Sequence, residues 1–334
     1  MLNPSGTVKY PFQWGVGTVV LEQFDGVDAA TARQTELSNA PPPLAFLSIA
    51  QILAHPRWPL ARDCYIGMAL DTSGPDPAIK RLMQNVARIV LFNIIVGLHE
   101  ARGPSRKTWP TINRIRETFE PFGLASPRRF DEMIARMRTV GLIELQPAPS
   151  DRRIRLVVPT ERMIAEDYAW QDFNMRALAV LQPESRAYDE VFSHNPLYRQ
   201  AQRIVSAGIF HKAQDILDPD ANPLVPFLAR QDGTKIILSY LEAALACGDP
   251  SRVSLSYETV SSRISTSRTH IRNLIELLEA DGYLKRHGKG GNDIELMPEL
   301  WRQAELFIAS ILSGNDYWWQ LTLARVASLE QSTQ

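Results

Sequence analysis

An internal repeat is the feature that most constrains the fold of this chain, which has 334 residues. Residues 126–160, SPRRFDEMIARMRTVGLIELQPAPSDRRIRLVVPT, resemble residues 267–299, SRTHIRNLIELLEADGYLKRHGKGGNDIELMPE. Farther along, residues 167–171 (DYAWQ) resemble residues 316–320 (DYWWQ) in the same order. A repeat at a fixed spacing means that one structural unit occurs more than once. We interpret the chain as two diverged copies of a unit of roughly 145 residues, preceded by an N-terminal extension of weak pattern.

Each copy of the repeat has the pattern of a capped helix followed by a hairpin. Ser126 and Ser267 stand where a helix N-cap is expected, and Gly141 and Gly282 stand where a left-handed residue ends the helix. Between serine and glycine, apolar residues recur at helical spacing, which predicts one buried helix face. These residues are Phe130, Met133, Ile134 and Met137 in the first copy and Ile271, Leu274, Ile275 and Leu278 in the second. Two short apolar runs separated by a polar turn follow, and they predict a β-hairpin.

A second helix precedes the capped helix in each copy, and further helices flank both. The pattern predicts helices over 44–54, 79–101, 233–247 and 257–264, and a short strand over 253–256. Two adjacent helices followed by a hairpin form the winged-helix arrangement. We therefore expect a mainly α-helical protein with small β-hairpins, in which two winged helix-turn-helix domains are held on a helical scaffold. The expected divisions are an N-terminal extension (1–78), a first winged-helix domain (79–170), a helical linker (171–227), a second winged-helix domain (228–313) and a C-terminal packing helix (314–334).

Positive charge is concentrated on the first copy, although the whole chain has a formal net charge of −1. Residues 101–162 contain 13 Lys and Arg against 7 Asp and Glu, whereas residues 163–249 contain 7 against 12. Residues 250–297 are nearly neutral, with 7 against 6. Because Lys and Arg bind a phosphate backbone by releasing its counterions, the first copy is the expected nucleic-acid-binding copy. The acidic region is expected to be a solvated scaffold that faces away from DNA.

The first copy resembles a known family of regulators. The stretch ASPRRFDEMIARMRTVGLIELQPAPSDRRIRLVVPTERM (125–163) is similar to winged-helix regulators of the MarR type. In that family a capped recognition helix ends in Gly-Leu-Ile, and a wing with an Asp-x-Arg pattern follows. Residues 141–143 and 151–153 match these two motifs, whereas the second copy has a Gly-Lys-Gly-Gly wing instead. Family members are usually single-domain chains that dimerise. The resemblance implies a winged-helix fold and the regulation of transcription through DNA.

The candidate DNA-binding residues lie where a winged helix contacts DNA, which is the start of the recognition helix, the preceding helix and the wing. Arginine can pair with guanine, asparagine can read adenine, and all the cations can bind phosphate. In the first copy the candidates are Lys107, Thr108, Arg114, Arg116, Ser126, Arg128, Arg129, Arg136, Arg152, Arg153 and Arg155. In the second copy they are Arg263, Ser267, Arg268, Thr269, His270, Arg272, Asn273, Arg286 and Lys289.

Signals for other kinds of chemistry are weak. Two distant cysteines, Cys64 and Cys247, rule out a disulfide scaffold and fit a reducing cytoplasm. The histidines lack metal-ligand spacing, and neither a phosphate-binding loop nor a nucleophile motif occurs. The longest apolar stretch, 89–97, is too short to span a bilayer. We therefore expect a cytoplasmic protein that is not an enzyme, with no metal, no cofactor and no membrane association.

The resulting hypothesis is a sequence-specific regulator of transcription that binds double-stranded DNA. Two unlike units in one chain predict an asymmetric operator with two half-sites. A plasmid replication initiator also resembles two winged helices in one chain, and a winged-helix scaffold for protein interactions is the alternative without DNA. The repeated aromatic segments 167–171 and 316–320 are interpreted as packing anchors, with a hydrophobic effector pocket as the alternative. A small-molecule effector and a homodimer both stay open.

Overall fold

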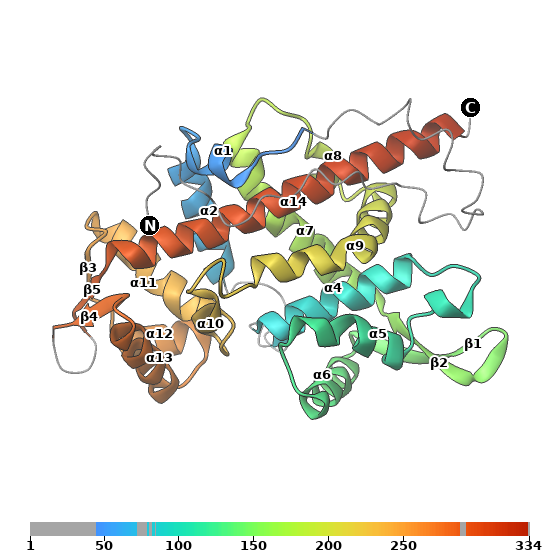
Figure 1. The fold of residues 1–334 in the computed structure, drawn as a ribbon, viewed down its shortest axis with the longest axis horizontal. Helices are drawn as coiled ribbons and strands as arrows, with labels where there is room; N and C mark the ends of the chain where they lie inside the picture. The colour runs from blue at the N-terminus through green and yellow to red at the C-terminus, as the bar shows by residue number, and fades with distance from the viewer. Residues whose placement is uncertain (1–44, 72–78, 80–81, 84, 288–291, 333–334) are drawn as a thin grey trace.

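The computed structural model describes residues 45–71, 79, 82–83, 85–287 and 292–332. The protein is mainly helical and has two small antiparallel sheets, as the sequence predicts (Figure 1). The first half contains α1 (Ile49–Leu53), α2 (Trp58–Leu70), α4 (Val86–Glu100), η3 (Arg106–Thr108), α5 (Ile112–Phe119), η4 (Glu120–Phe122), α6 (Pro127–Thr139), β1 (Ile143–Ala148), β2 (Asp151–Pro159) and α7 (Glu161–Leu181). The remainder contains α8 (Asp189–Phe192), α9 (Pro196–Ile216), α10 (Val225–Leu228), α11 (Gly233–Cys247), β3 (Arg252–Val253), α12 (Tyr257–Ile264), α13 (Arg268–Ala280), β4 (Leu284–Arg286), β5 (Ile294–Leu296) and α14 (Pro298–Ser332).

The predicted helix boundaries at the repeat are confirmed. The hydroxyl of Ser126 accepts the N–H of Arg129, and that of Ser267 accepts the N–H of His270, so each serine caps its helix. Gly141 and Gly282 follow α6 and α13 with φ of 73° and 77°, a left-handed conformation that costs glycine little. The eight apolar residues predicted for the two helix faces are all buried. Both halves therefore have the order helix, helix, hairpin.

Two other predicted elements have different boundaries. The helix expected over 79–101 appears as α4, which begins at Val86 because the side chain of Asn85 caps it by accepting the N–H of Ala87. The helix expected over 44–54 is the short α1, which begins after Ser48 in a capping box with Gln51.

The two hairpins belong to sheets of different size. β1 and β2 form a two-stranded antiparallel sheet, whereas β4 and β5 are joined by β3 in the order β3-β5-β4. The strand expected over 253–256 is thus shorter and begins one residue earlier. In the first half, the N–H of Val157 on β2 donates to the carbonyl of Pro110 at 2.8 Å. This contact corresponds to the pairing of β3 with β5 in the second half. The repeat therefore extends to the segment before the second helix.

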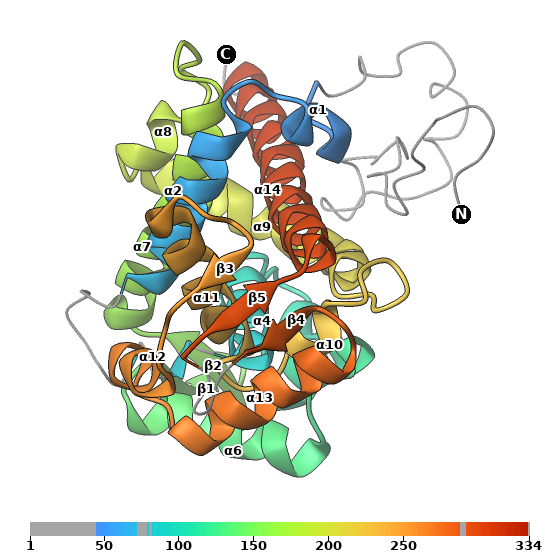
Figure 2. The same cartoon turned by 90° about the vertical axis from the view of Figure 1, so that its left-hand side faces the viewer.

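Helices from the two halves pack crosswise. α9 packs along α14 and against α4 of the first half, while α2 packs along α7 and against α11 of the second. α2 and α9 thus each contact helices of both halves. In addition, α7 contacts α14 directly. This contact joins the two helices that carry the repeated aromatic segments. Figure 2 shows α2, α7, α9 and α14 above the two helix-helix-hairpin units.

The expected domain divisions stay predictions, and this packing shows which helices connect them. The N-terminal extension (1–78) includes α2, whose Trp58, Ile66 and Leu70 are buried in the largest core. The helical linker (171–227) includes α9, which packs between the halves and has non-helical backbone angles at Ile209. The C-terminal helix (314–334) is the end of α14, which begins at Pro298. The sequence pattern did not show these features because helices buried on several sides lack a single apolar face.

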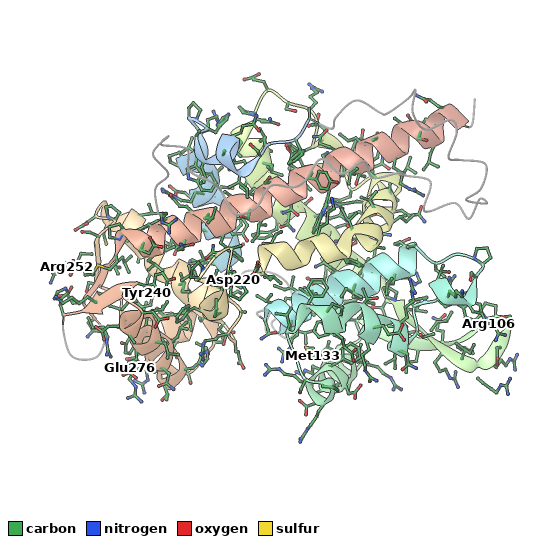
Figure 3. The ribbon with its side chains drawn as sticks, in the orientation of Figure 1. Arg106, Met133, Asp220, Tyr240, Arg252 and Glu276 are labelled. Carbon is green, nitrogen blue, oxygen red and sulfur yellow. The ribbon has the colours of Figure 1, made fainter. Side chains whose placement is uncertain are left out.

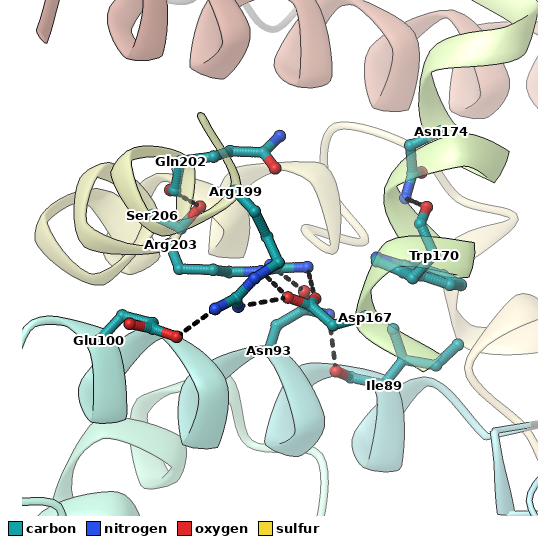
Figure 4. A network of polar contacts seen from close by, with 10 residues as sticks. All are labelled: Ile89, Asn93, Glu100, Asp167, Trp170, Asn174, Arg199, Gln202, Arg203 and Ser206. Atoms are coloured by element: carbon teal, nitrogen blue, oxygen red, sulfur yellow. Dashed lines mark hydrogen bonds and ion pairs between the residues drawn. The ribbon is translucent and has the colours of Figure 1, made fainter. Parts of the chain in front are cut away.

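A buried ionic network joins the halves and corrects the prediction for the acidic region (Figure 4). Asp167 of α7 has a fully buried side chain that accepts hydrogen bonds from Arg203 and from Arg199, both of α9. Arg199 also pairs with Glu100 of α4 at 2.5 Å. Part of the acidic region 163–249 is therefore interior rather than solvated. Its charge offsets arginines of the scaffold.

The repeated aromatic segments are partly packing anchors. Tyr317 and Trp319 are buried, and the indole N–H of Trp319 donates to the carbonyl of Ala187. Trp170 and Trp318, in contrast, are half-buried and line one cavity between the halves. Tyr317 and Trp319 thus act as packing anchors, whereas an effector pocket at Trp170 and Trp318 stays a hypothesis.

Candidate nucleic-acid interface

Helix α6 presents an exposed basic face opposite its buried face. Phe130, Met133, Ile134 and Met137 face the core, so Arg128 and Arg136 point away from it. The side chain of Arg128 is 91% exposed and makes one exposed pair with Glu132 at 3.1 Å. Such a pair contributes little to stability, so Arg128 can exchange it for another anion.

Helix α5 contacts α6 through the side chain of Arg116. Arg116 of α5 pairs with Asp131 of α6 at 2.5 Å, and its guanidinium lies 5.1 Å from the centre of the Phe130 ring. Arg116 therefore holds the two helices together, and its predicted DNA contact stays a prediction. Arg114, also predicted, lies half-buried on the same helix.

The first hairpin carries a second basic cluster. Arg152, Arg153 and Arg155 are exposed on β2, and the side chain of Arg153 is 91% exposed although it pairs with Asp151. Hydrogen bonds from Arg153 lower the pKa of the Asp151 carboxyl, which favours its ionised form. The carboxylate at the turn fixes the hairpin tip and leaves the other two guanidinium groups free to bind.

The loop before α5 packs beside this hairpin. The Trp109 side chain is buried against Ala148 and Leu156 of the hairpin. Lys107, two residues before Trp109, is exposed. The hydroxyl of Thr108 is used within its own loop, where it donates to the carbonyl of Ser105 at 2.7 Å. Thr108 therefore shapes the loop, whereas Lys107 faces solvent.

Arg106 is a basic residue of this site that the sequence prediction did not include. Figure 3 labels Arg106 beside the first hairpin. The Arg106 guanidinium lies 5.8 Å from the centre of the Trp109 ring and 3.8 Å from the Asp151 carboxylate. Arg138, near the C-terminal end of α6, is exposed and was also left out. Arg106 is next to the predicted Lys107, and Arg138 is two residues after the predicted Arg136, so counting every cation of the basic segment 101–162 would have found them.

The corresponding residues of the second half are mostly engaged in ion pairs. Ser267 caps α13, and the ring of His270 bonds to the carbonyl of Gln231 at 2.6 Å. Thr269 and Asn273 are exposed on the face that corresponds to the basic face of α6. Each predicted arginine lies within 4.0 Å of a glutamate: Arg263 with Glu242, Arg268 with Glu258, Arg272 with Glu276, and Arg286 with Glu276 and Glu279. Lys289 lies outside the described residues.

The two halves therefore differ in available positive charge. On α13 and its hairpin, Arg286 lowers the pKa of Glu279 by hydrogen bonding, and the pair keeps both charges at neutral pH. On α6 and the first hairpin, Arg129, Arg136, Arg152 and Arg155 have no ion pair within the part of the chain that the structure describes. The sequence-level charge difference is thus increased by the tertiary structure.

α6 and α13 lie at the same edge of the molecule. Both views place them at the lower edge, below α14 (Figures 1 and 2). Burial lowers the pKa of Arg88 on α4, and the neighbouring charges of Arg129 and Arg136 lower it further. Positive charge on α6 therefore continues toward the start of α4.

Comparison with known proteins gave no counterpart. No protein family, curated protein or solved structure matches this chain. Among the described residues, no cluster of His, Cys, Asp and Glu is arranged to hold a metal ion, and no helix is long and apolar enough to cross a bilayer. Any function must therefore be argued from the geometry of the chain itself.

Proposed function

We propose that this protein binds double-stranded DNA as a sequence-specific regulator of transcription, and that its first half supplies most of the affinity. The observation that carries the proposal is the group of exposed arginines without ion-pair partners among the described residues of α6 and the first hairpin. Helix N-terminal side chains read base edges in the major groove, and wing cations bind phosphate. The order α5, α6, β1, β2 supports a winged helix-turn-helix domain.

The second half is proposed to be a second winged helix-turn-helix domain with a different task. Its order α12, α13, β4, β5 is the same, but Arg263 and Arg286 are closely paired with glutamates. Exposed Thr269 and Asn273 can still hydrogen-bond to base edges. We infer that this half adds specificity more than affinity, which makes the DNA site asymmetric.

The joined halves support recognition of two half-sites at a fixed spacing. The crosswise packing and the buried network hold α6 and α13 at one edge of the molecule. Neighbouring half-sites on one face of B-DNA are about 34–36 Å apart. A single chain would then act like a dimer of single-domain regulators.

Selection of bound duplexes from a random DNA pool, followed by footprinting, tests the proposal. The full chain should select one asymmetric sequence. Alanine at both Arg128 and Arg129 should weaken its binding at least tenfold. A control with alanine at the exposed Arg186 and Arg302, away from α6, removes the same charge. Equal weakening by the control, or no selection at all, would overturn the proposal and favour an interaction scaffold. A footprint on direct repeats at an origin would favour a replication initiator.

A further inference from the structure

One turn of the second half contacts elements of both halves. Residues 230–232 form this turn, which joins α10 to α11, and in Figure 1 α10 lies between α6 and α13. The ring of His270 on α13 bonds to the carbonyl of Gln231 in the turn at 2.6 Å. The turn is therefore attached to the N-terminal part of α13, which is one of the two helices proposed to read DNA.

The backbone of this turn is held in one conformation. Asp232 is 3% exposed and has a φ of 56°, in the left-handed region that aspartate and asparagine tolerate better than most residues. A Cβ atom at Gly233 would lie 2.0 Å from the carbonyl oxygen of Phe227, so α10 packs directly on the backbone here. The side chains of the turn are therefore held at fixed positions between the halves.

The same turn also lies near charged side chains of the first half. Burial lowers the pKa of Arg88 on α4, and the charges of Arg129 and Arg136 on α6 lower it further, whereas the carboxylate of Asp232 opposes them. Charges affect one another in this way only when they are close together. Three arginines of the first half and one carboxylate of the second are therefore neighbours.

The helical positions of these arginines agree with that placement. Arg129 and Arg136 are seven residues apart, which is two turns of α6, so they share one flank of the helix. Asp131, on the other flank, pairs with Arg116 of α5. His270 is the third residue after the capping serine of α13, as Arg129 is in α6. Corresponding flanks of α6 and α13 therefore face the region between the halves.

Positive charge dominates this region. Arg230 is exposed on the turn, and it adds to the three arginines of the first half. Asp232 is the carboxylate that faces them, since Glu132 on α6 is paired with Arg128. Within the described residues, no ion pair engages Arg129, Arg136 or Arg230. The four junction arginines are Arg88, Arg129, Arg136 and Arg230.

We propose that the junction arginines bind the phosphate backbone of the DNA segment between the two half-sites. A group of like charges at one edge of the molecule attracts a polyanion, and phosphate contacts are independent of base sequence. The spacer would thus be read by its charge and not by its bases, while Asp232 limits the affinity. This inference rests on the proposed DNA-binding function and adds α4 and the turn at 230–232 to the interface.

A duplex with a neutral spacer tests the inference on the full chain. The probe is the selected duplex with its spacer phosphates replaced by methylphosphonates, and the control has as many methylphosphonates outside both half-sites. Fluorescence anisotropy should show about threefold weaker binding of the neutral-spacer duplex, with a salt slope smaller by about 0.9 per lost contact. The control duplex should bind normally. Equal binding of the two duplexes overturns the inference.

Substitution of Arg230 assigns the contact to the junction. Because this side chain is exposed, Arg230→Gln should fold normally and bind the unmodified duplex about threefold more weakly. On the neutral-spacer duplex, Arg230→Gln and wild type should bind alike, because the partner of the arginine is gone. Arg230→Lys should restore binding, and Arg302→Gln on α14 is the control of equal charge. A loss that persists on the neutral-spacer duplex overturns the assignment.

Asp232→Asn should have the opposite effect. Asparagine keeps the shape and tolerates the left-handed conformation, and the Asp232 side chain caps no N–H that would be lost. Without the carboxylate, affinity for the unmodified duplex should rise about twofold. Weaker binding by this variant overturns the role of Asp232. A chain that selects no duplex overturns the proposed function together with this inference, whereas one that binds DNA regardless of spacer charge overturns this inference alone.

Discussion

The guanidinium of Arg203 holds the carboxylate of Asp167 inside the protein with two hydrogen bonds, although 36 residues separate them in sequence. Because both side chains are buried, water cannot solvate the charge that remains if its partner is lost. The pair also joins α7 to α9, so it connects the first half to a helix that packs along the second. It is thus a structural connection between the halves.

The first prediction concerns this pair. Replacing Asp167 by Ala should lower the free energy of unfolding by about 3–5 kcal/mol, because Arg203 would remain buried and uncompensated. Asp189→Asn, which breaks an exposed pair with Arg186, should change it by less than about 0.5 kcal/mol. Urea denaturation measures both. Replacing both members, Asp167→Leu with Arg203→Met, should recover most of the loss, and failure to recover would argue against a pairwise effect.

The second prediction concerns the first hairpin. Alanine at Arg152 and Arg155 should reduce the slope of log K against log salt by about 1.8 in magnitude, because each phosphate contact contributes about 0.9. Fluorescence anisotropy with a labelled duplex at several salt concentrations measures this slope. The paired substitution of Arg186 and Arg302 provides the control of equal charge. A slope that stays at the wild-type value would remove the hairpin from the interface.

The third prediction uses the ion pairs of the second half. Glu276→Gln with Glu279→Gln should raise DNA affinity by roughly fivefold and increase the salt slope, because Arg286 becomes available to phosphate. Glu184→Gln with Glu299→Gln removes the same charge elsewhere and should have a smaller effect. The same anisotropy titrations compare the two variants. Equal effects would mean that α13 does not face the DNA.

The fourth prediction separates capping from DNA contact at Ser126. Ser126→Ala should destabilise the protein by about 1 kcal/mol because the N–H of Arg129 loses its acceptor. Ser126→Asn keeps a capping oxygen and should retain stability. Ser126→Asp should also retain stability, yet weaken DNA binding by repelling phosphate. Thermal unfolding and DNA titration together test this, and normal DNA binding by Ser126→Asp would place Ser126 away from the backbone.

The fifth prediction concerns pH and Asp316. Burial raises the pKa of the Asp316 carboxyl above its ordinary value of 3.8, although hydrogen bonds from Leu47, Gln320 and Tyr188 oppose this. The folded state therefore binds this proton more tightly than the unfolded state does. The contribution of Asp316 to stability is fully present below pH 3.8 and falls as pH rises through the raised pKa.

Comparing wild type with Asp316→Asn by urea denaturation tests this sign. The stability of the wild type relative to the variant should fall between about pH 4 and the pH at which the carboxyl ionises. A difference that rises with pH over this range would show that the hydrogen bonds outweigh burial.

The ends and buried faces of α6 and α13 could be predicted from the sequence because residues close together in the chain determine them. Ser126 with Gly141 and Ser267 with Gly282 mark the ends of α6 and α13, and the apolar period gives their buried faces. The position of Arg128 on the exposed face follows from that period alone. The role of Arg116 does not, because the sequence cannot show that Asp131 lies within its reach.

The sequence by itself determined the repeat, the order of elements in each half and the excess of positive charge in the first. Only the tertiary structure decided which charges stay available, because an ion pair such as Arg286–Glu279 or Arg203–Asp167 depends on where separate helices and strands meet. It also decided that α2 and α9 each pack against both halves, with a cavity between the halves. Packing of buried helices depends on shape rather than on a single apolar face, so no periodic pattern reports it.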